Sequence, residues 1–344
     1  MRHAFITGLA GPRLVPAEAQ FLRETRPVGI ILFARNCVDH DQICRLIGDA
    51  RDAIGADDVL TLVDQEGGRV QRLRSPLGRT LPAGRAYLTA AGNDVAMAAR
   101  TAKLVYRMLA DDLRQLGFNT NCAPVLDVPV PGAHDVIGDR AYATEPQAVT
   151  ALGLAVAQGL AAGGVLPVIK HIPGHGRAGC DSHHELPAVS ASRQDLAATD
   201  FAPFAAAAHL PAAMTAHVVY SDIDPEAPAT TSATVISEVI RGIIGFDGLL
   251  MSDDLSMKAL SGSLRTRAEQ SIRAGCDVAL HCNGDLSEMQ SVAAGVPALH
   301  GSAAQRFVAA WKVVDGNEPY DRGEAEAALE EVLGRGSAPA AESV

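Results

Sequence analysis

The chain has 344 residues, of which 48% are hydrophobic, so it is long enough to bury a large core. It carries 29 Lys and Arg against 40 Asp and Glu, a net charge of −11, which argues against nucleic acid or an anionic membrane surface as a partner. No stretch approaches the roughly 20 apolar residues that a membrane-spanning helix needs, and the N-terminus has no pattern of a secretion signal. The six cysteines are scattered without a Cys-x-x-Cys pair, so we expect a cytoplasmic protein with reduced cysteines.

Short apolar segments alternate along the chain with longer amphipathic segments. The segments that we expect to form strands are 3–10, 28–34, 59–65, 118–127, 165–171, 211–218, 248–253 and 276–282. The segments that we expect to form helices include 40–54, 94–116, 145–162, 193–209, 232–244 and 264–274. Several strand segments, such as 28–33, are apolar without alternation, which is typical of parallel strands buried on both faces.

This repeated order of strand and helix predicts the fold class. Alternation sustained about eight times indicates an α/β fold, and we expect the strands to close into a single-domain (β/α)8 TIM-type barrel. A doubly wound open sheet is the alternative. No linker or composition shift divides residues 1–300, and 302–334 has the pattern of packing helices. We therefore expect one catalytic barrel domain over 1–335 and a flexible tail over 336–344.

Polar residues gather directly after five of the predicted strands. They are residues 64–72 after the third strand, Asp127 and 138–140 after the fourth, 170–184 after the fifth, His217 after the sixth and 252–254 after the seventh. A solvated loop would explain any one of these groups. In a barrel, however, the carboxyl ends of the strands meet at one face, where barrel enzymes place their active sites. Their joint position therefore predicts one active site.

The segment 171–184 contains patterns of two other chemistries, and both fail on their context. Residues 174–179 match Gly-x-Gly-x-x-Gly, but Pro173 precedes them and no helix is predicted after them, so dinucleotide binding is not expected. Four histidines suggest a metal, yet the chain has no His-x-His pair. Pro173 and two glycines also prevent a helix that would place His171 and His175 one turn apart. We expect neither a metal nor a cofactor.

The remaining inventory fits the cleavage of a glycosidic bond. It consists of a carboxylate at a strand end, a histidine on a glycine-rich loop, and charged residues around them. Glycoside hydrolysis needs one group that attacks or stabilises the anomeric carbon and another that protonates the leaving oxygen. Charged side chains hold sugar hydroxyls through charge-assisted hydrogen bonds.

These motifs resemble those of glycoside hydrolase family 3, in particular its single-domain bacterial β-N-acetylglucosaminidases (β-hexosaminidases) of peptidoglycan recycling. The resemblance extends over about residues 8–283. It rests on ILFARN at 31–36, DQEGGRVQR at 64–72, APVLD at 123–127, KHIPGHG at 170–176, DSH at 181–183, GFDG at 245–248 and SDDLSM at 252–257. Together these motifs are specific for the family.

The resemblance implies a retaining mechanism through a covalent glycosyl-enzyme. It implies Asp253 as the nucleophile, His183 as the acid/base and Asp181 as the residue that orients His183. The residues that it implies for binding the sugar are Asp64, Arg72, Arg140, Lys170 and His171. The implied substrate carries a terminal β-linked N-acetylglucosamine, typically a cytosolic muropeptide that ends in 1,6-anhydro-N-acetylmuramic acid. As partners we expect this small carbohydrate alone, bound by a monomer or weak homodimer.

Two pairs of neighbouring residues compete for the catalytic roles. Adjacent strand residues point to opposite faces, so only one of Asp253 and Asp254 can face the substrate. Periodicity does not choose between them, because both faces of this strand are apolar; the resemblance favours Asp253. His183 is favoured over His184 by its spacing from Asp181 and by the match to the family motif.

Some residues around the motifs differ from the family's usual pattern. Ile172 stands where Phe is more common, and residues 141–142 are Ala-Tyr where Ser-Phe is common. These differences alter loop packing and affect substrate preference more than reaction type. We interpret Asp127, His175 and His217 as supporting residues of the site.

Two other functions remain alternatives. A histidine acid/base, unlike a carboxylate, does not repel phosphate, so the same residues would also serve a β-N-acetylglucosaminide phosphorylase. A sugar-binding barrel without activity is the second alternative, and the presence of Asp181, His183 and Asp253 argues against it.

Overall fold

A computed structural model describes residues 1–336 of the chain. The tail predicted over 336–344 lies, after its first residue, outside the described residues. Among the described helices, none combines the length and the apolar character that crossing a bilayer requires.

The strands form a closed parallel barrel. They are β1 (His3–Gly8), β2 (Pro27–Leu32), β3 (Leu60–Val63), β6 (Thr120–Asn121), β7 (Leu166–Pro167), β8 (Ile169–Ile172), β10 (Ala212–Thr215), β12 (Leu249–Asp254) and β13 (Val278–His281). Their order in the sheet is β7-β6-β3-β2-β1-β13-β12-β10-β8. Only Val168 separates β7 from β8, so the two ends of the sheet are halves of one strand and the barrel closes there. The predicted (β/α)8 barrel is confirmed, and the open doubly wound sheet is excluded.

The fourth strand is shorter than the predicted segment 118–127. The strand β6 ends at Asn121, three residues before Pro124, which has no backbone N–H to contribute to a ladder. The chain nevertheless stays beside its neighbour: Lys170 N–H donates to the carbonyl of Pro124, and Leu126 N–H donates to the carbonyl of Lys170. This contact leads the chain to Asp127 at the end of the barrel.

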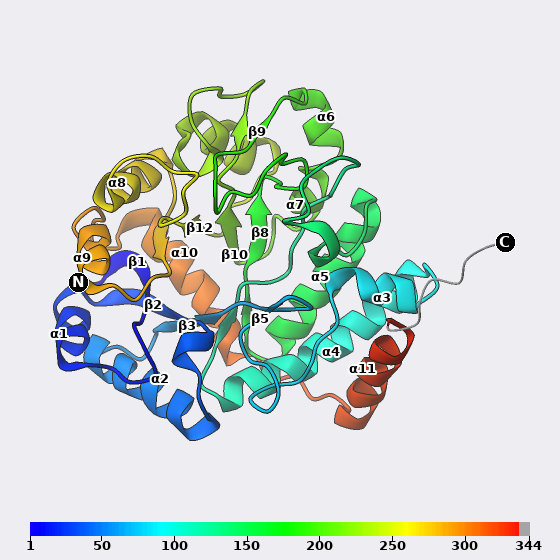
Figure 1. Cartoon of the computed structure of the whole chain (residues 1–344), viewed down its shortest axis with the longest axis horizontal. Coiled ribbons are helices and arrows are strands. Elements are labelled where there is room, and N and C mark those ends of the chain that lie inside the picture. Colours follow the sequence, from blue (N-terminus) through cyan, green and yellow to red (C-terminus); the bar gives the residue numbers. More distant parts are fainter. Residues whose placement is uncertain (337–344) are drawn as a thin grey trace.

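Helices surround the barrel, as Figure 1 shows. They are α1 (Pro16–Thr25), α2 (His40–Ile54), α3 (Gly84–Ala90), α4 (Val95–Gln115), α5 (Pro146–Ala162), α6 (Arg193–Ala198), α7 (Ala202–Ala206), η4 (Val235–Ile243), α8 (Leu264–Ala274), α9 (Leu286–Ala293), α10 (Gly301–Trp311) and α11 (Arg322–Gly336). The caps of α2 explain its bounds: the Asp39 side chain accepts from Gln42 N–H at the start, and Gly55 takes a left-handed conformation at the end. The segment 193–209 forms two short helices instead of the single predicted one, with buried Asp200 between them.

Short elements shape the face where the parallel strands end. The hairpin of β4 (Gln65–Gly67) and β5 (Val70–Gln71) follows β3, and the turn η2 (Gly138–Arg140) follows the fourth strand. A separate ladder joins β9 (Ala188–Val189) to β11 (Val219–Tyr220).

The barrel interior is an apolar core. Seven of the barrel strands contribute to it, and so do Cys122, directly after β6, and Val168, between β7 and β8. The strand residues are Ile6, Val28, Ile31, Leu60, Leu62, Leu166, Ala212, Met214, Leu249, Met251, Val278 and Leu280. Phe307 and Ala310 of α10 join this cluster, and α10 begins next to the start of β1, so it closes the amino-terminal end of the barrel. The opposite end is left for the site.

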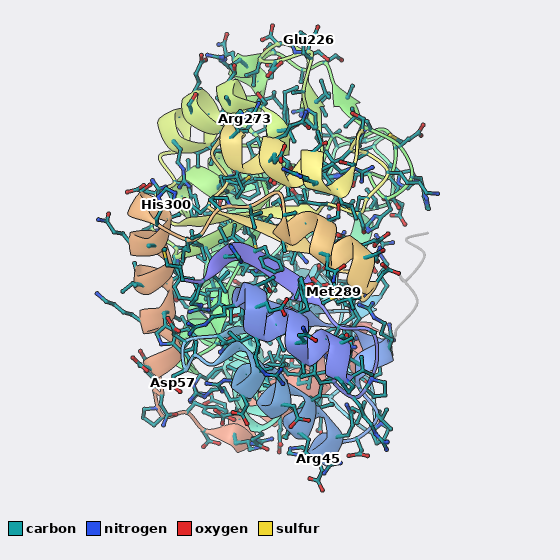
Figure 2. The ribbon with its side chains drawn as sticks, turned by 90° about the vertical axis from the view of Figure 1, so that its left-hand side faces the viewer. Arg45, Asp57, Glu226, Arg273, Met289 and His300 are labelled. Carbon is teal, nitrogen blue, oxygen red and sulfur yellow. The ribbon has the colours of Figure 1, made fainter. Side chains whose placement is uncertain are left out.

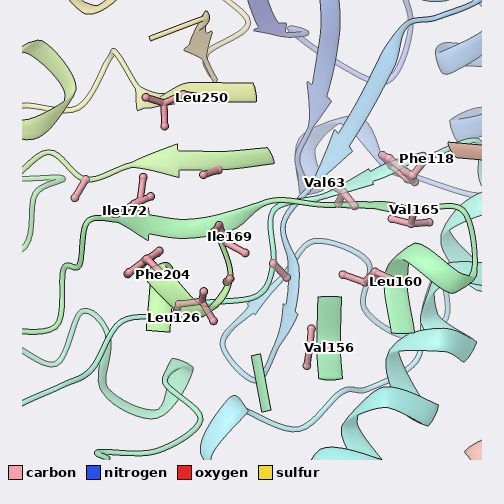
Figure 3. Packing of buried hydrophobic residues seen from close by; sticks show 14 of the residues in the cluster. Val63, Phe118, Leu126, Val156, Leu160, Val165, Ile169, Ile172, Phe204 and Leu250 are labelled. Atoms are coloured by element: carbon pink, nitrogen blue, oxygen red, sulfur yellow. The ribbon is translucent and has the colours of Figure 1, made fainter. Parts of the chain in front are cut away.

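A second apolar cluster lies between the strands and the helices. In Figure 3, Leu160 of α5 faces Val165, and Phe204 of α7 lies beside Leu126. Figure 2 shows another side of the molecule, with Arg45 of α2 and Arg273 of α8 at the surface, whereas Met289 of α9 is buried. Burial of each such aliphatic side chain contributes about 1.5–3 kcal/mol, which makes the barrel a rigid support for the site.

Candidate active site

A pocket of about 260 Å³ opens at the carboxyl end of the barrel strands. Ile31, Met214 and Leu280, which belong to the barrel interior, also line this pocket. The polar residues that line it are Asp64, Glu66, Arg72, Arg140, Lys170, His171, His175, Ser182, His183, Asp253 and Asp254. Small-molecule pockets commonly measure roughly 300–1,000 Å³, so this one suits a single sugar ring.

The structure brings the predicted site residues together. All of them except Asp181 line the pocket, and Asp181 contacts His183, which does. They come from the segments after β3 and β6, from β8 and the loop after it, and from the end of β12, which are far apart in the sequence.

One wall of the pocket is a continuous row of ion pairs, here called the charged wall. Lys170 Nζ lies 3.0 Å from Asp64 Oδ1 and 2.6 Å from Glu66 Oε1. Arg72 Nη2 lies 3.0 Å from Asp64 Oδ2. Arg140 binds both oxygens of Glu66, each at 2.9 Å. Every cation of the wall is thus paired with a carboxylate and presents its remaining N–H groups in a set direction.

The charged wall stays ionised at neutral pH. Burial alone would raise the pKa of Glu66, but Arg140 and Lys170 outweigh it and lower this pKa to about 2. For Asp64, Lys170 and Arg72 likewise outweigh burial and hold the pKa well below its usual value. Burial would lower the pKa of Lys170, but the carboxylates of Asp64 and Glu66 outweigh burial, so this pKa is raised. The wall therefore supplies fixed charges rather than a proton.

Glu66 is a pocket residue that the sequence analysis did not single out. It is 6% exposed and joins Arg140 to Lys170. Its spacing from Asp64 could have indicated this position. Alternate residues of an extended chain share a side, so Glu66 faces the same way as Asp64.

His171 is oriented by the buried carboxylate of Asp127. Its Nδ1 lies 2.7 Å from Asp127 Oδ2, and its backbone N–H donates to Oδ1 at 3.2 Å. Burial would raise the pKa of Asp127, but His171 and His175 outweigh it, so this carboxyl is ionised. An ionised carboxylate only accepts, so Nδ1 of His171 is the donor and Nε2 is available to the sugar.

The hydrogen bonds distinguish the two neighbouring aspartates. Asp254 Oδ1 accepts from the backbone N–H groups of Ser256 and Cys282, and its Oδ2 accepts from the Ser256 hydroxyl. Asp253 Oδ1 accepts only from the N–H of Asp254, at 2.8 Å, and no partner of Oδ2 is recorded among residues 1–336. Both line the pocket, but only Asp253 keeps an oxygen available for substrate.

Asp253 is held as a carboxylate beside a neutral histidine. Burial would raise the pKa of Asp253, yet the positive charge that His217 and His171 carry when they are protonated, together with the N–H of Asp254, produces a net lowering. Burial also lowers the pKa of His217, which is therefore uncharged at neutral pH. His217 Nε2 lies 3.0 Å from the carbonyl oxygen of Asp254, and its Nδ1 lies 2.7 Å from the Thr230 hydroxyl. These contacts hold the His217 ring next to the backbone of Asp254.

His183 and Asp181 form a pair on the loop after β8. His183 Nδ1 lies 2.7 Å from Asp181 Oδ1, and the His183 backbone N–H donates to the same oxygen at 2.9 Å. Burial would raise the pKa of Asp181, but these hydrogen bonds lower it. With Nδ1 held, Nε2 is the nitrogen of His183 that can exchange a proton with a ligand. His184 is exposed and does not line the pocket.

Within the part of the chain that the structure describes, no three His, Cys, Asp or Glu side chains are grouped so that they could hold a metal ion.

The chain was compared with known proteins. Residues 11–314 match the family model described as the glycosyl hydrolase family 3 N terminal domain. Among similar proteins, the β-hexosaminidase of Bordetella avium is 40% identical over 279 residues, which cover 80% of this chain and 79% of that protein. The β-hexosaminidase of Methylococcus capsulatus is 42% identical over 279 residues, covering 80% and 81%. The crystal structure of NagZ from Neisseria gonorrhoeae in complex with N-trifluoroacetyl-D-glucosamine is similar over 98% of both chains, with 33% identity and a TM-score of 0.85.

Proposed function

The chain belongs to glycosyl hydrolase family 3 and is a glycoside hydrolase of the β-hexosaminidase type; from this premise we propose that it is a retaining exo-β-N-acetylglucosaminidase. One observation carries the proposal. Asp253, with a carboxylate oxygen that has no protein partner in the described chain, shares a pocket of single-ring size with His183, which Asp181 orients.

In the first step, Asp253 attacks the anomeric carbon while the bond to the leaving oxygen breaks. His183, in its protonated form, gives its Nε2 proton to that oxygen, and a covalent glycosyl-enzyme remains. In the second step, neutral His183 takes a proton from water, the water oxygen attacks the anomeric carbon, and the bond to Asp253 breaks. Two inversions give net retention.

The charged wall and His171 support recognition of the non-reducing sugar ring. Lys170, Arg72 and Arg140 offer N–H donors, and Asp64 and Glu66 offer acceptors, which is the mixture that sugar hydroxyls require. Because these groups are already paired, they bind the sugar without first reorganising. We therefore assign substrate binding to Asp64, Arg72, Arg140, Lys170 and His171, with Glu66 in addition.

As natural substrate we propose a muropeptide in which N-acetylglucosamine is β-1,4-linked to 1,6-anhydro-N-acetylmuramic acid, cleaved in the cytoplasm during cell-wall recycling. The similarity to β-hexosaminidases and to NagZ supports the N-acetylglucosamine part of this assignment. We further propose that the protein acts as a monomer or weak homodimer.

Phosphorolysis is the competing reaction for the same residues. Arg72, Arg140 and Lys170 already pair with carboxylates, so they are poorly placed to bind an added phosphate. Assays of a panel of nitrophenyl glycosides, with and without phosphate, test the proposal. We expect hydrolysis of the β-N-acetylglucosaminide to free sugar in both buffers, with the β-anomer formed first. Sugar 1-phosphate as the main product, or the α-anomer formed first, would contradict it.

A further inference from the structure

The loop that carries His183, residues 173–187 between β8 and β9, is here called the acid/base loop. Its first residues are firmly anchored. Three of them bond to groups outside the loop: the carbonyl of Gly174 accepts from the Tyr220 hydroxyl at 2.5 Å, the N–H of His175 donates to Asp127 at 2.7 Å, and Arg177 Nε donates to buried Asp200 at 2.7 Å. At Gly176 a Cβ would collide with the backbone of Val128, so only glycine fits there. The base of the loop is therefore part of the rigid barrel end.

The second part of the loop, residues 181–186, has much weaker support. His183, His184, Glu185 and Leu186 are all exposed. Ser182 is the exception, because it is only 3% exposed and lines the pocket. In the sequence it stands between Asp181 and His183, the two members of the pair. Any contact that holds Ser182 consequently also holds His183.

Ser182 is held from the anchored part of the same loop. Its Oγ lies 3.1 Å from Nε2 of His175, whose side chain is also 3% exposed and lines the pocket. The carbonyl of Ser182 accepts a weaker hydrogen bond from the N–H of Ala259, at 3.3 Å. The His175 ring packs edge-on against the His171 ring, with centroids 5.6 Å apart. The ring is thus fixed by its backbone bond to Asp127 and by this packing.

Among residues 1–336, the bond to Ser182 is the only hydrogen bond of the His175 ring. Its Nδ1 is buried and has no partner among the described residues. Burial, and next to it His171, lower the pKa of His175 to about 4, so the ring is neutral during turnover near neutral pH. A neutral ring in this place neither carries charge to the substrate nor transfers a proton there. What it contributes is a directed contact to Ser182.

We propose that His175 and Ser182 are positioning residues, whose hydrogen bond fastens the acid/base loop over the pocket and so places His183 next to the leaving oxygen. The inference rests on the proposed role of His183 as acid/base. When the bond breaks, the segment from Asp181 to Leu186 is free to move away, as substrate entry requires. The bond therefore sets the fraction of time for which proton transfer is possible.

Ser182→Ala tests this role, with Ser190→Ala, an exposed serine beyond the loop, as matched control. Only a substrate with a poor leaving group needs protonation. For an alkyl or phenyl β-N-acetylglucosaminide we expect kcat/KM to fall about five- to tenfold, the factor that one hydrogen bond of ordinary net strength represents. For the dinitrophenyl glycoside we expect a change of less than about twofold, because its leaving group departs without protonation. Ser190→Ala should behave as the wild type with both substrates.

Hydrogen–deuterium exchange gives a readout that is independent of turnover. In Ser182→Ala, exchange of peptides within 178–187 should rise while the barrel strands keep wild-type protection. His175→Gln, whose amide keeps a donor at similar reach, should lose less activity on the poor substrate than His175→Ala. Equal losses on both substrates in Ser182→Ala, no loss at all, or unchanged exchange would overturn the proposal.

Measurement of His183→Ala in the same assays separates the positioning role of Ser182 from the acid/base role of His183. A dependence on the leaving group in His183→Ala but none in Ser182→Ala removes the positioning role and leaves the acid/base assignment standing. No such dependence in His183→Ala removes the acid/base assignment itself.

Discussion

The carboxylate of Asp127 is fully buried and accepts a hydrogen bond from Nδ1 of His171, with 2.7 Å between Nδ1 and Oδ2. His171 lines the pocket, whereas Asp127 does not, so Asp127 supports the ring from outside the pocket. The same carboxylate anchors the start of the acid/base loop through the N–H of His175. One buried aspartate thus fixes both a residue proposed to bind sugar and the base of the loop proposed to deliver the proton.

Replacement of Asp127 should therefore weaken sugar binding. In Asp127→Asn the charged acceptor of His171 Nδ1 is lost, so the ring loses the contact that orients it towards the sugar. We expect the affinity for N-acetylglucosamine, measured by calorimetry, to fall about tenfold, in line with the loss of a hydrogen bond to a charged group. Unchanged affinity would show that the orientation of His171 is unimportant for binding.

Asp253 should carry the covalent intermediate. A fluorinated N-acetylglucosaminide with a slow second step should label a peptide that contains residues 249–257, at Asp253, and mass spectrometry identifies the site. Asp253→Ala should lose several orders of magnitude in turnover. Asp254→Asn is the matched control, because Asp254 bonds to backbone groups; it should lower the melting temperature and leave the site of labelling at Asp253. Label on any other residue would disprove the assignment.

The effect of His183 on the rate of cleavage should increase with the need of the leaving group for protonation. His183→Ala should slow substrates with poor leaving groups far more than the dinitrophenyl glycoside, because general acid catalysis contributes roughly 10²–10⁴-fold where protonation is required. Asp181→Asn should give a smaller change of the same pattern, since Asp181 only orients the ring. His184→Ala, at an exposed neighbour outside the pocket, serves as control. Uniform losses across leaving groups would direct attention to His184.

The charged wall should make stability depend on acid pH. The pKa of Glu66 is lowered to about 2 from 4.5, so its contribution is fully present above about pH 4.5 and is lost as the pH falls towards 2. Urea unfolding of Glu66→Gln should show a cost of about 3–5 kcal/mol at neutral pH, because Arg140 and Lys170 lose their shared anion. Its difference from the wild type should shrink in acid. Glu226→Gln, at an exposed position, should match the wild type throughout.

Activity should not depend on a metal. The mechanism assigns His171 to the sugar and His183 to the proton, so neither is reserved as a ligand. Exhaustive chelation followed by assay should leave turnover intact. Loss of activity on chelation, restored by a divalent ion, would reopen the metal interpretation.

The sequence by itself determined the barrel and most of the polar residues that line its pocket. Eight apolar segments separated by amphipathic ones specify parallel strands with helices outside, since hydrophobic burial follows periodicity. Once the strands are parallel, their carboxyl ends share a face, so polar residues after them must meet there. This is why Asp64, Lys170, His183 and Asp253 were predicted as neighbours, although Asp64 and Lys170 are 106 positions apart.

Only the tertiary structure decided how those residues are paired. The bonds of Asp254 to the backbone of Ser256 and Cys282, and the bond of Ser182 to His175, depend on where loops from different strands come to rest. The place of Glu66 between Arg140 and Lys170 depends on the same packing. Hydrogen bonds and ion pairs act over about 3 Å and only along set directions, whereas the periodicity of a sequence specifies faces and not distances. The sequence pattern therefore indicates which residues reach the site, and the tertiary packing determines which of them bind to one another.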